Sequence, residues 1–392
     1  MNRRTAVPLL SLALISVGCR DAGLTDPTAS LVRALPASHS GGMTVMTRNL
    51  YLGTDLSPLL AAPPALVAFV AAEAFARMQA TDFPARAEAL ADEIAATDPH
   101  LVGLQEVTLY RTQTPSDAAL GGTTPATTVF QDFLAILLDA LGARGLDYRV
   151  AVVQENADAE VPVFTGNGPD GLPTFMDLRL TDRDAILVRG DLAFSDPKRG
   201  HYAVNQPGVI GGRPFVFLRG WTSVVATLGG HRLRFFNTHL EVQMFAAVQT
   251  AQAAELLAIA HHERLPVLLV GDFNSDAGGT QTPSYRLIVA AGFRDAWRDR
   301  SSPAAGEPGF TCCHAPDLRN EEPTLDQRID FVFIGGRFPW NHRRIRAIQA
   351  TVLGDELGDR TPSGLWPSDH AGVAATLTLP SRFSLARNEV QR

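Results

Sequence analysis

The chain has 392 residues, of which 45% are hydrophobic and 19% are charged, so it can bury a large core, and we expect one globular domain. No internal segment is predicted to be a transmembrane helix. The formal net charge of -7, without a Lys/Arg run interleaved with aromatic residues, argues against tight non-specific binding of nucleic acid, but a nuclease that uses a metal ion stays compatible with it.

The first residues have the pattern of an export signal. Arg3 and Arg4 precede an apolar run over residues 6–17, which is too short for a permanent transmembrane helix. We therefore predict a signal peptide over residues 1–18 and an exported protein.

The end of this signal is typical of a bacterial lipoprotein. There Cys19 would be lipidated and would anchor the protein at the membrane surface of the cell envelope. Ser16 stands where leucine is usual, so cleavage and free secretion is the alternative. Residues 19–42 are rich in Ala, Ser, Thr and Pro and are predicted to be a flexible tether. The globular domain is expected over residues 43–380, followed by a C-terminal tail, 381–392.

The domain is predicted to begin with a strand over residues 44–49, which places Asn49 at its end. Residues 56–78 form an apolar, Ala-rich insertion with Pro63-Pro64 near its start, and we expect a helix in it. Such a surface could dock on a membrane and bring a lipid-cleaving enzyme to its substrate. The alternative is that the insertion packs against its own domain.

A further helix is expected from Asp82 to about Asp98, because proline stands in its first turn and apolar residues recur at helical spacing. The strand after it, residues 100–105, leads to Glu106. A single carboxylate at a strand end is a natural ligand for Mg²⁺, a hard ion that takes oxygen ligands and keeps several waters. A surface glutamate is the alternative.

The middle of the chain alternates between regular elements and loops. A Gly/Thr/Pro-rich loop is expected over residues 112–127, and residues 130–141 form an amphipathic helix that covers a sheet. A strand is expected over residues 148–153, and residues 156–177 are predicted to be a loop.

Two later strands end in polar residues. The strand over residues 233–237 leads to His239, and the apolar run 265–270 is typical of a strand buried on both faces. The second strand stops at Gly-Asp-Phe-Asn, where Asp272 and Asn274 are expected to project to the same side because side chains alternate along a strand. A carboxylate and an amide held this way suit a metal-bound phosphate and its attacking water. An Asx-type turn is the alternative.

Cys312 and Cys313 are neighbours in the sequence. Adjacent cysteines pair only with strain, so we expect packed thiols, and together with His314 they make an incomplete zinc set, which indicates a structural role. Farther on, Asp330 lies in an expected strand over residues 328–334.

Five polar clusters, each at the end of an apolar run, resemble in type and order the signature of the endonuclease/exonuclease/phosphatase superfamily, which includes DNase I-like nucleases, inositol-phosphate phosphatases and bacterial sphingomyelinases. The clusters are residues 46–50, 104–107, 237–240, 271–274, and 328–331 followed by 368–370. The resemblance spans about residues 43–379. It implies an α/β (α+β) fold, a four-layer sandwich of two packed mixed β-sheets flanked by helices, with the site at one rim of the sheets. The sequence pattern alone does not distinguish this from a three-layer fold.

The resemblance implies a metal site. Glu106, helped by Asn49 and Asp369, would hold Mg²⁺, with Mn²⁺ or Ca²⁺ as alternatives. The ion would polarise a phosphate oxygen.

It also implies catalytic roles. Asp330 would orient His370, which together with Asp272 would prepare water for in-line attack on phosphorus. Asn274 and His239 would stabilise the charge that grows on the phosphoryl oxygens.

The strand over residues 182–189 resembles the family strand that carries substrate-side polar residues. On this basis Asp182 or Asp184 could orient His239. A salt bridge of either carboxylate with Arg179 or Arg183 is the alternative.

The sequence therefore predicts a monomeric, extracytoplasmic phosphodiester hydrolase, acting on nucleic acid or on a phospholipid head group. The alternatives are a phosphomonoesterase of the inositol-phosphate phosphatase type, which would want a cluster of Lys and Arg that this sequence does not show, and a non-catalytic surface binding protein on the same scaffold.

Overall fold

The computed structural model describes residues 42–301, 307–335 and 345–379, which belong to one compact unit. The predicted signal peptide, Cys19, the tether up to residue 41 and the C-terminal tail lie outside these residues. Within the described part of the chain, no helix combines the length and the apolar character needed to cross a bilayer.

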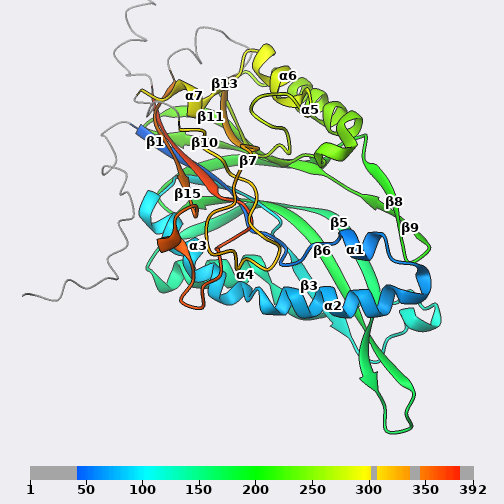
Figure 1. Cartoon of the computed structure of the whole chain (residues 1–392). Coiled ribbons are helices and arrows are strands. Elements are labelled where there is room, and N and C mark those ends of the chain that lie inside the picture. The colour runs from blue at the N-terminus through cyan, green and yellow to red at the C-terminus, as the bar shows by residue number, and fades with distance from the viewer. Residues whose placement is uncertain (1–41, 302–306, 336–344, 380–392) are drawn as a thin grey trace, which may run out of the picture. The chain divides into compact units, whose positions relative to one another are not determined.

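Two mixed β-sheets form the centre of the domain (Figure 1). In spatial order, the larger sheet contains β15 (Arg346–Leu353), β16 (Gly372–Thr378), β1 (Gly42–Asn49), β2 (Leu101–Gln105), β6 (Pro173–Arg189), β3 (Leu109–Gln113) and β4 (Thr128–Asp132), with β5 (Tyr148–Asn167) also paired to β6. The smaller contains β13 (Arg294–Asp295), β14 (Asp330–Gly335), β12 (Val267–Asp272), β11 (His231–His239), β10 (Gly220–Leu228) and β7 (Ala193–His201). A separate hairpin consists of β8 (Gln206–Ile210) and β9 (Arg213–Phe217).

Helices cover the outer faces of both sheets. The α-helices are α1 (Ser57–Leu60), α2 (Val67–Ala80), α3 (Phe83–Thr97), α4 (Phe133–Ala143), α5 (Ala246–His261), α6 (Ser284–Ala290) and α7 (Ala296–Asp299). The short 3₁₀ helices are η1 (Pro64–Leu66), η2 (Ala118–Leu120), η3 (Gln243–Phe245) and η4 (Leu357–Asp359). Figure 1 shows α2, α3 and α4 beside the larger sheet and α5 and α6 beside the smaller one. The predicted four-layer sandwich is therefore confirmed.

Three hydrophobic cores hold these layers together, because each sheet is apolar on both faces. Side chains from the facing surfaces of the two sheets, such as Val45, Phe235 and Leu268, form the central core. One outer core lies between α2, α3, α4 and the larger sheet. The other, which includes Phe273, lies between α5, α6 and the smaller sheet.

Local signals in the sequence define the covering helices. Helix α3 begins after Asp82, whose carboxylate accepts a hydrogen bond from the Ala85 backbone N–H (3.4 Å), and Pro84 lies in its first turn, as predicted. Helix α4 begins after Asp132, which caps it through the Leu134 N–H (3.1 Å). The helix predicted over residues 130–141 therefore begins three residues later, because Phe130 and Gln131 belong to β4.

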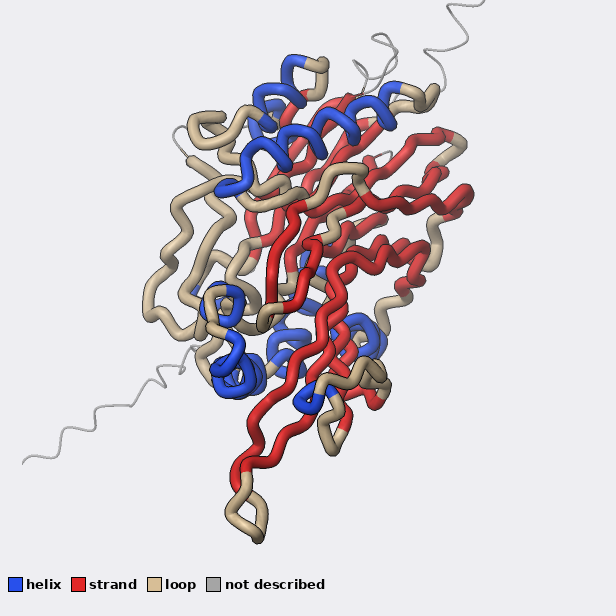
Figure 2. The backbone as a smooth tube through the Cα atoms, turned by 90° about the vertical axis from the view of Figure 1, so that its right-hand side faces the viewer, coloured by secondary structure: helices blue, strands red, loops and turns tan. Residues whose placement is uncertain are grey.

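The prediction of a loop over residues 156–177 is wrong. These residues complete β5 and begin β6, two long antiparallel strands whose ends extend past the rest of the sheet in Figure 2. The pairing shifts register at Val150/Val152, at Glu155/Asp158 and at Phe164/Gly166. Each shift moves the following side chains to the opposite face, so the regular alternation that marks a strand is interrupted.

The insertion over residues 56–78 forms α1, η1 and the first part of α2. Val67, Ala71 and Met78 are buried against the domain, whereas Leu66 is 50% exposed and Phe69 is 45% exposed. The insertion therefore packs against its own domain along one face and presents apolar side chains to solvent on another.

Candidate active site

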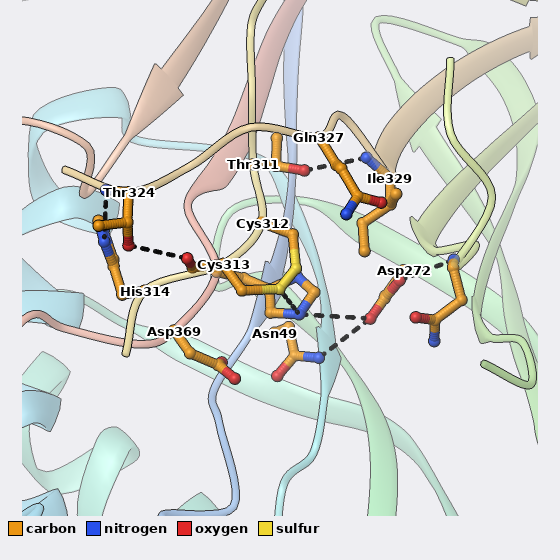
Figure 3. Close-up of a disulfide and its surroundings, with 12 residues drawn as sticks. Asn49, Asp272, Thr311, Cys312, Cys313, His314, Thr324, Gln327, Ile329 and Asp369 are labelled. Carbon is orange, nitrogen blue, oxygen red and sulfur yellow. Dashed lines mark hydrogen bonds and ion pairs between the residues drawn. A yellow bond between two sulfur atoms is a disulfide. The ribbon is translucent and has the colours of Figure 1, made fainter. Parts of the chain in front are cut away.

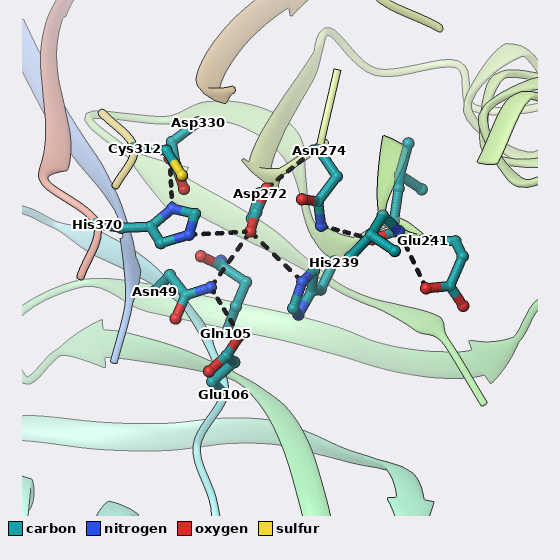
Figure 4. A network of polar contacts seen from close by, with 12 residues as sticks. Asn49, Gln105, Glu106, His239, Glu241, Asp272, Asn274, Cys312, Asp330 and His370 are labelled. Atoms are coloured by element: carbon teal, nitrogen blue, oxygen red, sulfur yellow. Dashed lines mark hydrogen bonds and ion pairs between the residues drawn. The ribbon is translucent and has the colours of Figure 1, made fainter. Parts of the chain in front are cut away.

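Strand ends from both sheets converge at one place, where a cluster of polar side chains lies (Figure 4). In the larger sheet β1 and β2 are parallel, and in the smaller sheet β11 and β12 are parallel, so the carboxyl ends of each pair lie at the same edge. Strands β14 and β16 run antiparallel to β12 and β1 and therefore begin at these edges. The residues delivered there are Asn49, Glu106, His239, Asp272, Asp330 and His370.

Asp272 lies at the centre of this cluster and is buried. Its Oδ2 accepts a hydrogen bond from Asn49 Nδ2 (3.2 Å) and lies 3.4 Å from His239 Nε2 and 3.8 Å from His370 Nε2. Burial, together with the negative charge of Asp330, raises the pKa of Asp272 to about 7. This carboxylate can therefore take up and release a proton near neutral pH.

Gly271 allows β12 to deliver Asp272 at this position. Its φ of +146° is one that side-chain-bearing residues rarely adopt, and a Cβ atom there would lie 2.0 Å from the Thr238 carbonyl oxygen of β11. The glycine before Asp272 is thus required by the close approach of β11 and β12.

His370 and Asp330 form a buried pair. His370 Nδ1 lies 2.9 Å from Asp330 Oδ2, which leaves Nε2 facing Asp272. Although burial opposes the charged imidazolium, the carboxylates of Asp330 and Asp272 raise the pKa of His370 well above its ordinary value of 6.5. The two carboxylates therefore favour the charged form of His370, whose Nε2 is directed at Asp272.

His239 receives a hydrogen bond that the sequence did not predict. Arg219, between β9 and β10, donates from Nη1 to His239 Nδ1 (2.8 Å), and its Nη2 lies 3.6 Å from Glu241. Burial and the positive charge of Arg219 lower the pKa of His239 well below 6.5, so this histidine is neutral. Since a guanidinium can only donate, the ring proton of His239 is on Nε2, the nitrogen that faces Asp272.

The predicted partners of Asp182 and Asp184 are therefore wrong. His239 is held by Arg219 rather than by either carboxylate. Asp184 accepts a hydrogen bond from Asn156 (2.9 Å), and the two arginines proposed as alternatives pair elsewhere, Arg179 with Asp158 and Arg183 with Asp132. Register shifts in β5 bring these residues together, and they are not visible as a sequence pattern.

Glu106 and Asn49 lie on the side of the cluster that belongs to the larger sheet. Glu106 has a φ of +53°, and its carboxylate accepts hydrogen bonds from Asn49 Nδ2 (3.3 Å) and from the Leu52 backbone N–H (2.7 Å). Asn49 Oδ1 accepts from the Tyr51 N–H (2.9 Å), so Asn49 presents its N–H groups to the two carboxylates.

The donor set fits a divalent cation. Burial and the charge of Asp182 raise the pKa of Glu106, and burial raises the pKa of Asp369 to about 6, an effect to which Glu106 contributes. A cation bound beside neighbouring carboxylates stabilises their charged forms. Asp272, Asp330 and His370 also lie close enough together to hold an ion.

Asn274 takes part in the turn that follows β12. Its backbone N–H donates to Asp272 Oδ1 (2.8 Å), and its side-chain Nδ2 donates to the Leu240 carbonyl (3.0 Å). With a φ of +48° it forms an Asx-type turn, and Figure 4 shows its amide beside His239 and Asp272. The structure therefore shows the Asx-type turn, and the catalytic role of Asn274 stays a prediction.

The predicted packed thiols of Cys312 and Cys313 are corrected by the structure, in which the two sulfur atoms are bonded (Figure 3). Cys312 forms bridges with Gln327 and with His370, and Cys313 Sγ lies 3.9 Å from His370 Nε2. The loop that carries both cysteines therefore borders the site.

Sequence reasoning missed two contributors to the site. Arg219 lies between two apolar strands, directly before β10. Because β10 pairs with β11, which ends at His239, this position could have indicated a contact with His239. Asn237 joins the two sheets, because its Oδ1 accepts from Gln105 Nε2 (2.5 Å) and its Nδ2 donates to the carbonyls of Leu104 (2.9 Å) and Ala185 (3.2 Å). Asn237 belongs to the polar cluster 237–240, but its hydrogen-bond partners are far away in the sequence.

Solved structures with the same fold are similar to this chain at low sequence identity. A protein of the endonuclease/exonuclease/phosphatase family from Leptotrichia buccalis C-1013-b has a TM-score of 0.53 at 14% identity, over 86% of this chain and 100% of that chain. A functionally unknown conserved protein from Enterococcus faecalis V583 has a TM-score of 0.50 at 17% identity. A mannosyl-6-phosphatase from Bacteroides thetaiotaomicron VPI-5482 has a TM-score of 0.49 at 17% identity. Each of these two matches covers 86% of this chain and 100% of the other chain. Among curated protein sequences none matches significantly.

The model of the Endonuclease/Exonuclease/phosphatase family matches residues 49–370, which begin and end at residues of the candidate site. Enzymes of this family are hydrolases that act on phosphoesters and generally depend on a divalent metal. The resemblance predicted from the five polar clusters is thereby confirmed, and the chain belongs to the endonuclease/exonuclease/phosphatase family.

Proposed function

We propose that the protein is a Mg²⁺-dependent phosphodiester hydrolase that acts outside the cytoplasm. The observation that carries this proposal is the convergence of Asn49, His239 and His370 on one buried carboxylate, that of Asp272. The export signal expected over residues 1–18, with lipidation at Cys19 or free secretion, supports the location.

Glu106 and Asp369 would hold the metal, which when bound supplies positive charge that polarises a phosphoryl oxygen. Asn49 would keep Glu106 in place through its N–H group. Because Asn49 also donates to Asp272, it would fix the position of the base relative to the metal-binding carboxylate.

Asp272 is the proposed general base. Its pKa of about 7 allows it to accept the proton of the attacking water at neutral pH. His370, which carries positive charge and is oriented by Asp330, would position that water and stabilise the charge that develops at phosphorus. In this proposal Asp272 accepts the proton and His370 positions the water, whereas the family resemblance implied that both residues jointly prepare the water.

His239 is neutral and carries its proton on Nε2, so it would donate a hydrogen bond to a phosphoryl oxygen. Asn274 lies beside it and would donate the N–H that does not bind the Leu240 carbonyl. Both donors are held by other groups before substrate binds, which reduces the reorganisation needed in the transition state.

The test is hydrolysis of bis-p-nitrophenyl phosphate by the purified protein with Mg²⁺ and with a chelator, next to plasmid DNA, sphingomyelin and a monoester. We expect His370→Ala and Asp272→Asn to lower kcat by about 10³-fold or more, because each removes a group that acts on the reacting atoms. His262→Ala, at the exposed end of α5, is the matched control and should leave the rate unchanged. Near-native activity of either site variant, or a chelator-resistant rate, would contradict the proposal.

A further inference from the structure

An apolar cavity of about 150 Å³ opens beside the candidate active site. Its walls come from the insertion (α1 and α2), from β5 and β6, and from the β8–β9 hairpin, and most of them are aliphatic or aromatic. Glu106, Asp182 and Arg219 line the cavity as well as the site, so the two spaces are continuous. A cavity of roughly this volume in another protein takes up benzene, so an apolar group of several carbon atoms fits here.

The polarity of the cavity changes along its length. At the end shared with the active site, Asp182 Oδ1 and Arg219 Nε are buried and have no hydrogen-bond partner among the described residues. Tyr110, which also lines the cavity, donates its hydroxyl to the Leu52 carbonyl (2.8 Å) and therefore presents only its ring. The cavity thus suits a ligand that is polar at the phosphoryl end and apolar beyond it.

The elements that build the outer wall also present apolar side chains to solvent. Leu60 lines the cavity and is 36% exposed, and Leu66 and Phe69 follow it on the insertion. Val209 and Val216, on the β8–β9 hairpin, are exposed too. A Cβ atom added to Gly211 at the tip of this hairpin would lie 3.3 Å from Val67, so the hairpin and the insertion are in contact. Contiguous apolar surface around an apolar cavity is typical of a lipid-binding site.

We propose that this cavity binds the hydrocarbon chain of an amphipathic phosphodiester while the phosphoryl group of the same substrate lies at Asp272. This inference rests on the proposed function, and it names a lipid-like phosphodiester as the substrate. A nucleoside fits less well, because a base has hydrogen-bonding groups along its edge that aliphatic walls leave unsatisfied. A hydrocarbon chain has no hydrogen-bonding groups that burial would leave unsatisfied, and each methylene group removed from water makes the binding free energy more favourable.

The test is a series of p-nitrophenyl phosphodiesters whose second ester group is methyl, butyl or octyl, assayed with Mg²⁺. We expect kcat/KM to rise about three- to fourfold for each methylene group until the cavity is full. Ala159→Phe places a ring in the cavity from β5 and should abolish this rise, measured as the ratio of kcat/KM for the octyl ester to kcat/KM for the methyl ester of the same variant. Ala193→Phe, exposed on β7, is the matched control and should keep the full dependence on chain length.

The other possible results distinguish a failure of the cavity assignment from a failure of the proposed hydrolysis. A rate that does not depend on chain length, or one that Ala159→Phe does not change, overturns the cavity assignment while the proposed hydrolysis stands. A preference for the p-nitrophenyl ester of thymidine 5′-phosphate over the octyl ester, lost in Ala159→Phe, would mean that the cavity takes a nucleoside.

The cavity can also be tested without turnover. If no diester in the series is hydrolysed, the proposed function fails, and calorimetric binding of octylphosphonate against methylphosphonate still measures the cavity. Equal affinity of the two phosphonates for the natural protein overturns the inference. If Ala159→Phe does not fold, Ala157→Phe fills the same cavity from the same strand.

Discussion

The protonation of His239 depends on one residue, Arg219. A neutral imidazole has one N–H and one free nitrogen, and only the hydrogen bond from Arg219 decides which nitrogen carries the proton. Burial disfavours the charged form of His239 most, and the positive charge of Arg219 disfavours it further. Arg219 is therefore a positioning residue that acts through His239.

We expect Arg219→Met to lower kcat/KM by about ten- to hundredfold, the usual effect of removing a residue that orients a functional histidine. Without the guanidinium, the pKa of His239 should rise, because one of the effects that lower it is gone while burial remains. The pH titration of the His239 ring protons by NMR measures this rise. Arg199→Met, at an exposed position of β7, is the control. An unchanged titration of His239 in Arg219→Met would show that Arg219 has only a structural role.

At the scale of elements, helix α3 holds two loops of the site in place through Arg86. This fully buried side chain donates to the backbone carbonyls of Thr81 (2.8 Å), Leu50 (2.6 Å), Tyr51 (3.1 Å) and Pro367 (3.0 Å). Leu50 directly follows Asn49, and Pro367 lies two residues before Asp369. One arginine on a covering helix thus ties together the loops that deliver both residues.

We expect Arg86→Met to lower the free energy of unfolding by about 3 kcal/mol or more, because several buried carbonyls lose their donor. Arg144→Met, directly after the C-terminal end of α4, is the matched control. It removes ion pairs to the exposed Glu88 and Asp92 and should cost only about 1 kcal/mol or less. Urea unfolding at equilibrium measures both values. Equal losses of unfolding free energy in the two variants would show that Arg86 does not hold the two loops in place.

At the scale of the whole molecule, the site concentrates buried acidic groups, and this couples stability to pH. The pKa of Asp272 rises to about 7 and that of Asp369 to about 6, above their ordinary value of 3.8, and the pKa of His370 also rises. The folded protein therefore retains protons that the unfolded chain releases, so stability falls as the pH rises through these pKa values. His239 has the opposite effect, but only below its ordinary value of 6.5.

We expect the metal-free protein to have a higher Tm at about pH 6.5 than at about pH 8, because the pKa of Asp272 is raised into this interval, whereas histidines with lowered pKa values act mainly below it. Mg²⁺ should raise Tm more at the higher pH, since the cation and the protons compete for the same carboxylates. Glu106→Gln should remove most of the effect of Mg²⁺. Thermal unfolding followed by circular dichroism measures these shifts, and an equal shift at both pH values would contradict the assigned metal site.

The sequence by itself determined the order of the strand ends and the polar residues that they carry, and the family resemblance that these residues support implied the four layers of the fold. Apolar periodicity marked β1, β2, α3 and β12, and the polar residues after them, such as Asn49 and Asp272, identified the family. These features are local, because a strand or helix and the residue that ends it lie within one short segment.

Only the tertiary structure decided the contacts between segments. Three features follow from which strands pair and in which register: the hydrogen bond from Arg219 to His239, the long β5–β6 pair with its register shifts, and the cavity beside Glu106. A shift of one residue moves every side chain to the other face of a sheet, and the sequence shows no trace of this shift until the partner strand is known. For this protein, the residues that could perform the chemistry were therefore readable from the sequence, whereas the protonation state of His239 and the space for a substrate chain depend on packing across distant parts of the chain.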